Sequence, residues 1–441
     1  MRRILFTILV VLIALCLFSA CSMTGMTATP ASQPTQLTSS DDDQPAGENA
    51  ADGQANAAPN AQDGATGTED VQESTTTSDG SEASAASGEA ANADESAAGE
   101  AQPSDGARQA TVAEGEIPEE YSPTTGLIGT TTTYKPVIVQ IENEPPARPQ
   151  AGIQWADIVY ETMIEAIDTR FTCIFNDVLY EEGSPDKLEV GPVRSSRYYH
   201  QWIQGEWDAL YVFQGGAETP GKESYIWGES GDHIKQRINA AGKKPSNANL
   251  IYRRTNTGKA LEHTAYTELH TDADIYNYEP VARQPFKYYP LESYDDKPEI
   301  SKIELPFWSQ SQNWLEYRYD AESDKLIRYM SDSEFIAEET GKALEVQNLI
   351  IQYTSVSEFP DEGGRKKIEM FGHGPAEFII HGKHISGTWE RANSASSPTM
   401  YYTEDGEEIT LTPGNTWIEI YPNDKKVVTT YTDGSQSVTN E

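Results

Sequence analysis

The chain has 441 residues and a formal net charge of −38 at pH 7. Binding to nucleic acid or docking on anionic headgroups is not expected, because both need a basic patch. The length is sufficient to bury a hydrophobic core, so the fold does not require disulfides.

The first 21 residues have the pattern of a bacterial lipoprotein signal peptide. Two arginines precede an apolar run over residues 4–18, and a Ser-Ala pair stands directly before Cys21. The run is short for a membrane span, which leaves an ordinary secretory signal or a short membrane anchor as the alternative. We expect removal of residues 1–20 and attachment of a diacylglycerol to Cys21, which would anchor the chain in the lipid bilayer.

Cleavage at this point would decide the state of the other cysteines. Cys16 would leave with the signal peptide, and Cys173 would be the remaining free thiol. Because Cys173 lies in the apolar run 171–175, we interpret it as a small core residue. A nucleophilic role would require exposure and a nearby base.

Residues 21–120 are predicted to form a disordered acidic linker. They consist mainly of small and polar residues, with about twenty acidic side chains against the single base Arg108. Such a composition buries too little apolar surface to offset the entropy lost on ordering. A flexible segment of this length reaches roughly 50–60 Å, so it would act as a tether.

Residues 121–282 are predicted to form an N-terminal α/β domain. Apolar, β-branched runs indicate four strands, at 136–141, 156–163, 170–175 and 208–213. The segment 144–149, rich in proline, should form an extended loop after the first strand. Helices are expected at 196–206 and at 232–241, the second ended by Gly242.

Residues 283–425 are predicted to form a mainly β domain, followed by a polar tail at 426–441. Turn residues separate short β-rich runs at 300–305, 314–319, 348–353, 376–380, 385–390 and 417–421. The predicted fold class is therefore α+β, with mixed α/β character in the first domain.

Several segments closely resemble the YerB-like lipoprotein family, a two-domain family of unknown function. The N-terminal segments are KPVIVQIENEPPARPQAG, ADIVYE, TRF and GPVRSSR, and the C-terminal ones include YRYDAESDKLIRY, GTWER and LTPGNTW. The resemblance covers about residues 130–421 in the right order. It implies a lipid-anchored, extracytoplasmic protein of Gram-positive-type envelopes and implies no established reaction.

Arginines and hydroxyls give the first candidate site. Arg148 follows a double proline, Arg170 enters a strand, and Arg194-Ser195-Ser196-Arg197 precedes a predicted helix. Guanidiniums and free N–H groups at a helix start can bind a carboxylate or phosphate. The alternative is that Ser195 caps the helix, while Arg170 and Arg194 pair with Asp157, Glu161 or Glu165 inside the fold.

His263 is placed near the same site by the resemblance, which implies a histidine in the N-terminal cleft at this position. Its expected role is a hydrogen bond that fixes the loop. The closest histidine pair, His381 and His384, lies in a predicted hairpin without a complete ligand set, so no metal site is expected.

Glu161 and Glu165 give an alternative site, because carboxylates about 5–10 Å apart can cleave a glycan by acid/base chemistry. Residues 216–222 have the Gly-x4-Gly-Lys spacing of a phosphate-binding loop. Glu223 stands where such a loop needs Ser or Thr for magnesium, and Glu218 adds a negative charge. We therefore predict a Gly/Pro turn there and no nucleotide.

The sequence favours a binding protein over an enzyme. The predicted function is a lipid-anchored envelope lipoprotein at the extracytoplasmic face of the cell membrane. It would bind a cell-wall polymer or an extracytoplasmic protein through an Arg/Ser-lined cleft of the N-terminal domain, without a cofactor. A hydrolase acting on envelope glycan through Glu161 and Glu165 is the alternative.

Overall fold

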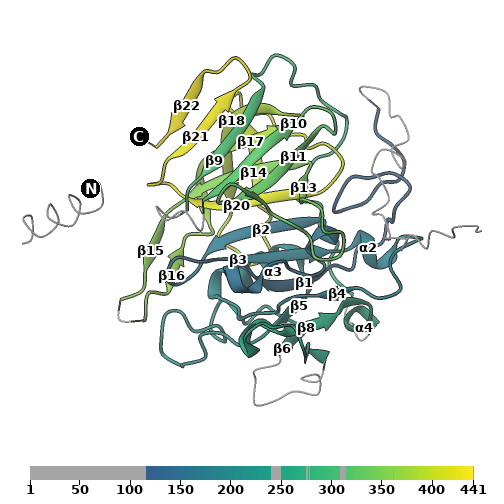
Figure 1. Ribbon diagram of the computed structural model, residues 1–441, viewed down its shortest axis with the longest axis vertical. Coiled ribbons are helices and arrows are strands. Elements are labelled where there is room, and N and C mark those ends of the chain that lie inside the picture. Colours follow the sequence, from purple (N-terminus) through teal and green to yellow (C-terminus); the bar gives the residue numbers. More distant parts are fainter. Residues whose placement is uncertain are drawn as a thin grey trace, which may run out of the picture. The chain divides into compact units, whose positions relative to one another are not determined.

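The computed structural model describes residues 116–239, 250–274, 277, 279–307, 314–360 and 362–440. The predicted signal peptide, Cys21 and nearly all of the predicted linker lie outside these ranges. Within them, β-strands predominate, and the strands form two large sheets and two small ones (Figure 1). The described part contains no helix with the length and apolarity that a membrane crossing requires.

The largest sheet has ten strands and combines segments from both halves of the chain. Its order is β19-β18-β17-β14-β20-β2-β3-β1-β5-β6. The N-terminal half supplies β1 (Val137–Glu142), β2 (Ile158–Met163), β3 (Thr169–Phe175), β5 (Leu210–Phe213) and β6 (Arg237–Asn239). The C-terminal half supplies β14 (Asn348–Thr354), β17 (Gly372–Ile380), β18 (Lys383–Arg391), β19 (Met400–Thr403) and β20 (Thr416–Pro422).

The two halves join where β20 pairs in parallel with β2. The register runs from Ile158 opposite Thr416 to Thr162 opposite Ile420. Strand pairing therefore joins the predicted N-terminal domain, residues 121–282, to the predicted C-terminal domain, which begins at residue 283. Both strands are buried along their length, as expected for a parallel pair covered on both faces.

In the described ranges, helices are few and short, so the fold is predominantly β, and the α content is smaller than predicted. They are α2 (Asp177–Tyr180), α3 (Tyr198–Trp207) and α4 (Leu269–Asp274), with 3-10 turns at Pro145–Ala147, Ile153–Trp155 and Leu261–His263. The helix predicted at 196–206 corresponds to α3. The helix predicted at 232–241 is wrong as far as residue 239, because Ile238 pairs with Val212 in the parallel edge of the sheet.

The seven-stranded sheet corrects the prediction of a polar tail. It contains β9 (Ile300–Leu305), β10 (Leu315–Asp320), β11 (Lys325–Met330), β12 (Ser333–Glu334), β13 (Glu345–Val346), β21 (Val427–Tyr431) and β22 (Gln436–Thr439). The last two strands form a hairpin that pairs with β9. Val and Thr favour strands, and they occur in both strands of this hairpin among polar residues.

Two small sheets complete the fold. A ribbon formed by β15 (Val356–Glu358) and β16 (Lys366–Ile368) extends beyond the large sheets (Figure 1). The other small sheet has the order β4-β8-β7, with β4 (Glu189–Val190), β7 (Tyr252–Arg253) and β8 (Ala265–Glu268).

Hydrophobic residues cover both faces of the central strands. On one face, Val139 and Phe171 pack with Tyr317 of the seven-stranded sheet. On the other face, Ile138 and Tyr160 pack with Tyr199, Ile203 and Trp207 of α3. Successive strand residues point to opposite faces, so each buried strand contributes to both clusters. Cys173 lies fully buried in the first cluster, which confirms it as a core residue.

Candidate functional site

Glu161 and Glu165 do not form the pair that the hydrolase hypothesis requires. Glu161 points from β2 toward the seven-stranded sheet and pairs with Arg328, and neither side chain is exposed. Glu165 lies beyond the end of β2 and binds Arg197 at the start of α3, which covers the opposite face of the sheet. Burial would raise the pKa of Glu165, but the hydrogen bond and charge of Arg197 outweigh it and lower the pKa.

Arg328 is the centre of a buried polar cluster that sequence reasoning missed. Its Nη2 lies 2.6 Å from Glu161, and its Nη1 lies 3.2 Å from Oε1 of Glu419. Tyr317 donates a 2.5 Å hydrogen bond to the same Glu419 oxygen. Burial and the charge of Glu161 raise the pKa of Glu419 well above its usual range, so the surroundings favour its protonated form. The sequence signal for this cluster was Glu419, which lies inside the apolar strand 416–422, because a buried carboxyl needs a polar partner.

Three residues predicted from the sequence meet at Ser195. Arg170 donates from Nη1 to the carbonyl oxygen of Ser195 at 2.7 Å and approaches its Oγ at 3.2 Å. Arg197 donates from Nη1 to the same Oγ at 3.0 Å. Arg170 is only 2% exposed, and within the described part of the chain no carboxylate forms an ion pair with it. Burial and the neighbouring Arg197 lower the pKa of Arg170 to about 10, so it remains charged.

The start of α3 is capped differently from the alternative proposed from the sequence. Arg197, and not Ser195, is the N-cap residue, and its backbone N–H donates to Nδ1 of His200 at 3.0 Å. Nε2 of His200 therefore carries the proton and lies 2.8 Å from Oγ1 of Thr162. Burial, with Arg170 and Arg197 nearby, lowers the pKa of His200 well below its usual range, so it is neutral.

Arg194 and His263 meet at a different carboxylate. Arg194 lies 2.9 Å from Oε1 of the buried Glu142, and Nδ1 of His263 lies 3.0 Å from the other oxygen. Arg194 also lies 3.5 Å from Glu144. Arg194 thus pairs inside the fold, as the alternative expected, but with none of the three carboxylates named there. His263 contacts the carboxylate of Glu142, and its role in fixing the loop stays a prediction.

The ligand atoms of Glu142, Glu144 and His263 lie within 4.8 Å of one another, a spacing that could hold a cation. Arg194 already supplies a positive charge to this group. Burial raises the pKa of Glu142, although His263 and Arg194 oppose the shift. The sequence did not reveal this group, because His263 lies 121 residues after Glu142 in the chain.

Arg148 lies apart from the other predicted arginines. It donates from Nη2 to the backbone carbonyl of Asn143 at 2.8 Å and from Nε to the side-chain oxygen at 3.2 Å. Its guanidinium stands over the ring of Phe335, 5.6 Å from the centroid. Burial and the charge of Arg328 lower the pKa of Arg148 to about 10. The structure therefore groups Arg170, Ser195 and Arg197 and separates them from Arg148.

Comparison with known families covers both halves of the chain. A sequence model described as "Protein of unknown function (DUF3048) N-terminal domain" matches residues 124–279, and the corresponding C-terminal domain matches residues 303–418. The chain belongs to the DUF3048 family. This result confirms the resemblance stated from the sequence and assigns no reaction.

A protein of Bacillus subtilis (strain 168) named "Putative lipoprotein YerB" is 28% identical to this DUF3048 chain over 296 residues. The match spans 66% of this chain and 82% of that protein. The crystal structure of the YerB protein from Bacillus subtilis is also similar, with a TM-score of 0.56 and 26% identity. That match covers 73% of this chain and 100% of the crystallised one.

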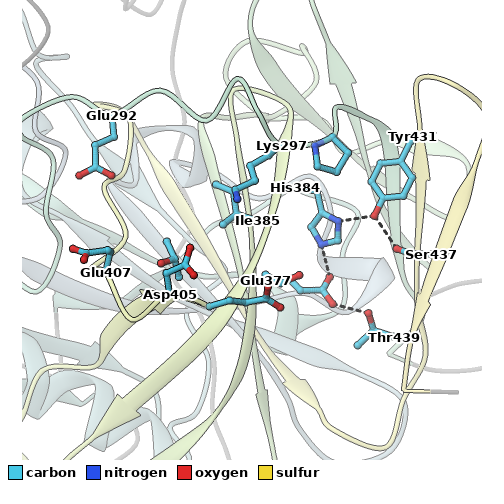
Figure 2. A pocket seen from close by; sticks show the side chains of 14 residues that line it. Glu292, Lys297, Glu377, His384, Ile385, Asp405, Glu407, Tyr431, Ser437 and Thr439 are labelled. Atoms are coloured by element: carbon cyan, nitrogen blue, oxygen red, sulfur yellow. Dashed lines mark hydrogen bonds and ion pairs between the residues drawn. The ribbon is translucent and has the colours of Figure 1, made fainter.

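A cavity of about 530 Å³ lies in the C-terminal half (Figure 2). It is lined by residues inside the match to the C-terminal DUF3048 domain, such as Glu377 and His384, and by Tyr431, Ser437 and Thr439 beyond it.

Five polar side chains on one side of this cavity form a hydrogen-bond network, namely Glu377, His384, Tyr431, Ser437 and Thr439 (Figure 2). Nε2 of His384 lies 3.1 Å from Glu377, and Nδ1 lies 2.9 Å from the hydroxyl of Tyr431, which contacts Ser437 at 3.0 Å. Thr439 donates to the other oxygen of Glu377 at 2.6 Å. Because an ionised carboxylate only accepts, Nε2 of His384 donates to it. His381, the other histidine of the predicted hairpin, has different partners, because it contacts Asp324 and Thr412.

Proposed function

We propose that this chain is an extracytoplasmic lipoprotein that binds an anionic group of a cell-wall polymer. The lipid on Cys21 would hold it at the outer face of the cell membrane of a Gram-positive-type envelope. Residues 22–120 would form the tether, and the folded part would bind the ligand at Arg170, Ser195 and Arg197. The lipoprotein signal pattern and the name of the similar Bacillus subtilis protein support the anchor.

The buried charge of Arg170 carries the binding part of the proposal. A buried guanidinium usually has a carboxylate partner, because an uncompensated buried charge is strongly destabilising. Arg170 instead donates to Ser195, and its Nε has no hydrogen-bond partner within the described part of the chain. An anion arriving at Ser195 would interact with this charge and lower the cost of burying it.

We propose a different task for each of the three residues. The Oγ of Ser195 accepts hydrogen bonds from two guanidiniums, so its own proton remains available for an oxygen of the ligand. Arg197 is partly exposed, at 14% of its side chain, and can contact the ligand directly. Arg170 is buried behind Ser195 and would contribute its positive charge. Carboxylate and phosphate groups both fit this set of donors.

Binding is tested by the retention of the purified full chain, in detergent, on an insoluble cell-wall preparation. Ser195→Ala should weaken retention by about tenfold or more, because a hydrogen bond to a charged group contributes about 1.5–3 kcal/mol. Ser323→Ala is the matched control, since Ser323 lies exposed in the turn between β10 and β11 and contacts only Asp320. Equal retention of the two variants would refute this site.

Competition by soluble ligands distinguishes the possible sources of the anion. Inorganic phosphate should release the retained chain if the polymer contributes a phosphate, and acetate should release it if the polymer contributes a carboxylate. Retention that neither ion affects, together with capture of an envelope protein that depends on Ser195, would transfer the site to a protein partner.

The anchor is tested separately by Cys21→Ser. Cells fed a labelled fatty acid should incorporate label into the parent chain and not into the variant, and the variant should leave the membrane fraction. Ser22→Ala is the control, because it changes the next residue and keeps the cysteine. Label that persists in the Cys21 variant would disprove lipidation at this residue.

A further inference from the structure

Residues 216–222 have the spacing of a phosphate-binding loop, and the residues directly after this segment bind an anion. The anion is the carboxylate of Glu362 in the same chain. The backbone N–H of Glu223 donates to Oε1 of Glu362 at 3.1 Å, and the N–H of Ser224 donates to Oε2 at 3.4 Å. The hydroxyl of Ser224 donates to Oε2 as well. Successive backbone N–H groups that point at one anion form a typical oxyanion site.

Glu362 is ionised in this loop. Burial would raise its pKa, but the hydrogen bonds from Ser224 and Glu223 and the charge of Lys222 outweigh burial and lower the pKa. The loop therefore binds a full negative charge, although Glu223 itself rules out the magnesium site of a nucleotide-binding loop.

Glu362 reaches the loop from the β15–β16 ribbon, which has little support of its own. The ribbon contains three paired positions, from Val356 opposite Ile368 to Glu358 opposite Lys366. A two-stranded ribbon of this size is marginally stable in isolation. Its position therefore depends on contacts with the rest of the protein. These include the burial of Ile368 in the second hydrophobic cluster, the ring contact of Phe359 with Tyr198, and the hydrogen bonds of Glu362.

Two polar contacts place the ribbon beside the Ser195 site. The hydroxyl of Tyr198 donates to the carbonyl of Ile368 and accepts from its N–H, both at 2.9 Å. Tyr198 immediately follows Arg197. Arg365 of the ribbon connection lies 3.8 Å from Glu165, the carboxylate that binds Arg197. The ribbon thus contacts both the first residue of α3 and the partner of Arg197.

We propose that residues 222–224 form an oxyanion-binding site that Glu362 occupies as an internal ligand, and that an external phosphate or carboxylate competes with it. Displacement of Glu362 releases the ribbon from α3. That release makes Arg197 and Ser195 more accessible to the envelope ligand, a consequence that rests on the function proposed above. The loop and the ribbon would then form a gate that responds to free oxyanions.

Hydrogen exchange of the full chain tests the occupancy of the loop. In Glu362→Gln, exchange of the peptides containing Ser224 and Ile368 should rise by about tenfold or more, because a charge-assisted set of hydrogen bonds is lost. Glu358→Gln is the matched control. It removes a carboxylate from the same ribbon, but one that binds Lys366 within it. Equal exchange in the two variants would overturn the proposal.

Competition is tested by adding sodium phosphate or sodium acetate, each against sodium chloride at the same ionic strength. In the parent chain, at least one oxyanion should accelerate exchange at Ile368, and in Glu362→Gln the same ion should protect Ser224. The ion that does so identifies phosphate or carboxylate as the preferred competitor. If neither ion has an effect beyond chloride, Glu362 is a fixed structural contact and the proposal fails.

Wall retention of Glu362→Gln distinguishes the gate from the binding function. Higher retention than that of Glu358→Gln supports the gate. Unchanged retention with a released ribbon refutes the gate and leaves the oxyanion loop intact. If the parent chain shows no retention that depends on Ser195, the proposed function fails, whereas the exchange measurements still decide the occupancy of the loop.

Discussion

Arg328 and Glu161 form an ion pair with 2.6 Å between Nη2 and Oε2, and neither side chain has exposed surface. Glu161 comes from β2 in the N-terminal half of the chain, and Arg328 comes from β11 in the C-terminal half. The pair connects the two large sheets across the first hydrophobic cluster, where Arg328 also stands over the ring of Trp417.

Loss of Arg328 should strongly destabilise the fold. Arg328→Met should lower the free energy of unfolding by about 3–5 kcal/mol, because it leaves Glu161 buried without its cation. Glu419→Gln should change it by about 1 kcal/mol or less, because burial favours the protonated, neutral form of Glu419. Urea unfolding followed by tryptophan fluorescence measures both. Equal destabilisation by the two variants would show that Glu419 is ionised.

Asp272 should make stability depend on pH in the neutral range. Burial raises the pKa of Asp272 to about 7, and the hydrogen bond from Thr267 opposes only part of the shift. Folding therefore favours the protonated form. Its contribution is complete below about pH 4 and is lost as the pH rises to about 7.

Asp272→Asn cannot ionise, so its stability relative to the parent should rise by roughly 2–4 kcal/mol between pH 4.5 and 8. Urea unfolding at these two pH values provides the measurement. Asp274→Asn, an exposed change in the same helix, should follow the parent at both values. Parallel behaviour of all three proteins would show that Asp272 titrates normally.

Glu377 should make the free energy of unfolding depend on pH in the opposite direction from Asp272. Burial would raise its pKa, but His384 and Thr439 outweigh burial and lower the pKa below the ordinary value. Its stabilising contribution is present above the pKa of an unfolded glutamate, about 4.3, and is lost as the pH falls through the folded pKa. Glu377→Gln should lose about 1.5–3 kcal/mol at pH 7 and less at acid pH.

Unfolding at pH 7 and pH 3.5 checks this expectation. Glu404→Gln changes an exposed carboxylate of the same cavity and should have little effect at either pH. A constant difference between Glu377→Gln and the parent across this range would contradict the expectation.

Cys173 should be unreactive in the folded protein. It is fully buried, and burial raises the pKa of its thiol well above the usual range, so little thiolate forms. If Cys21 is lipidated after cleavage as proposed, a thiol reagent such as Ellman's reagent should detect no thiol in the native chain and one thiol after unfolding in urea. Rapid labelling before unfolding would show that the first cluster opens.

The local pattern of the chain was enough to locate most strands of the large sheet. Runs such as 136–141 and 170–175 are apolar and β-branched, and they lie at β1 and β3. The same approach failed at 427–439, because Thr, Ser and Gln dominate those strands. These strands join the sheet because β21 pairs with β9, which lies more than 120 residues earlier in the chain, and β22 pairs with β21.

The candidate site could be predicted only in part for the same reason. The cluster Arg194-Ser195-Ser196-Arg197 is visible in the sequence, and the structure brings Arg170 to it. Arg194, however, turns to Glu142, and Arg148 turns to Asn143. The direction of a side chain depends on which strand face it occupies and on what packs there, and neither is encoded locally.

Three features can be read from the sequence without a structure: the signal pattern ending at Cys21, the acidic composition of the linker, and the family to which the folded part belongs. These are properties of contiguous segments. Folding then determines which groups meet. Arg328 meets Glu161, Glu362 meets Ser224, and Arg170 meets Ser195, with no ion pair to a carboxylate of the described residues. Buried charges select partners by distance in space, so residues far apart in the chain decide their state.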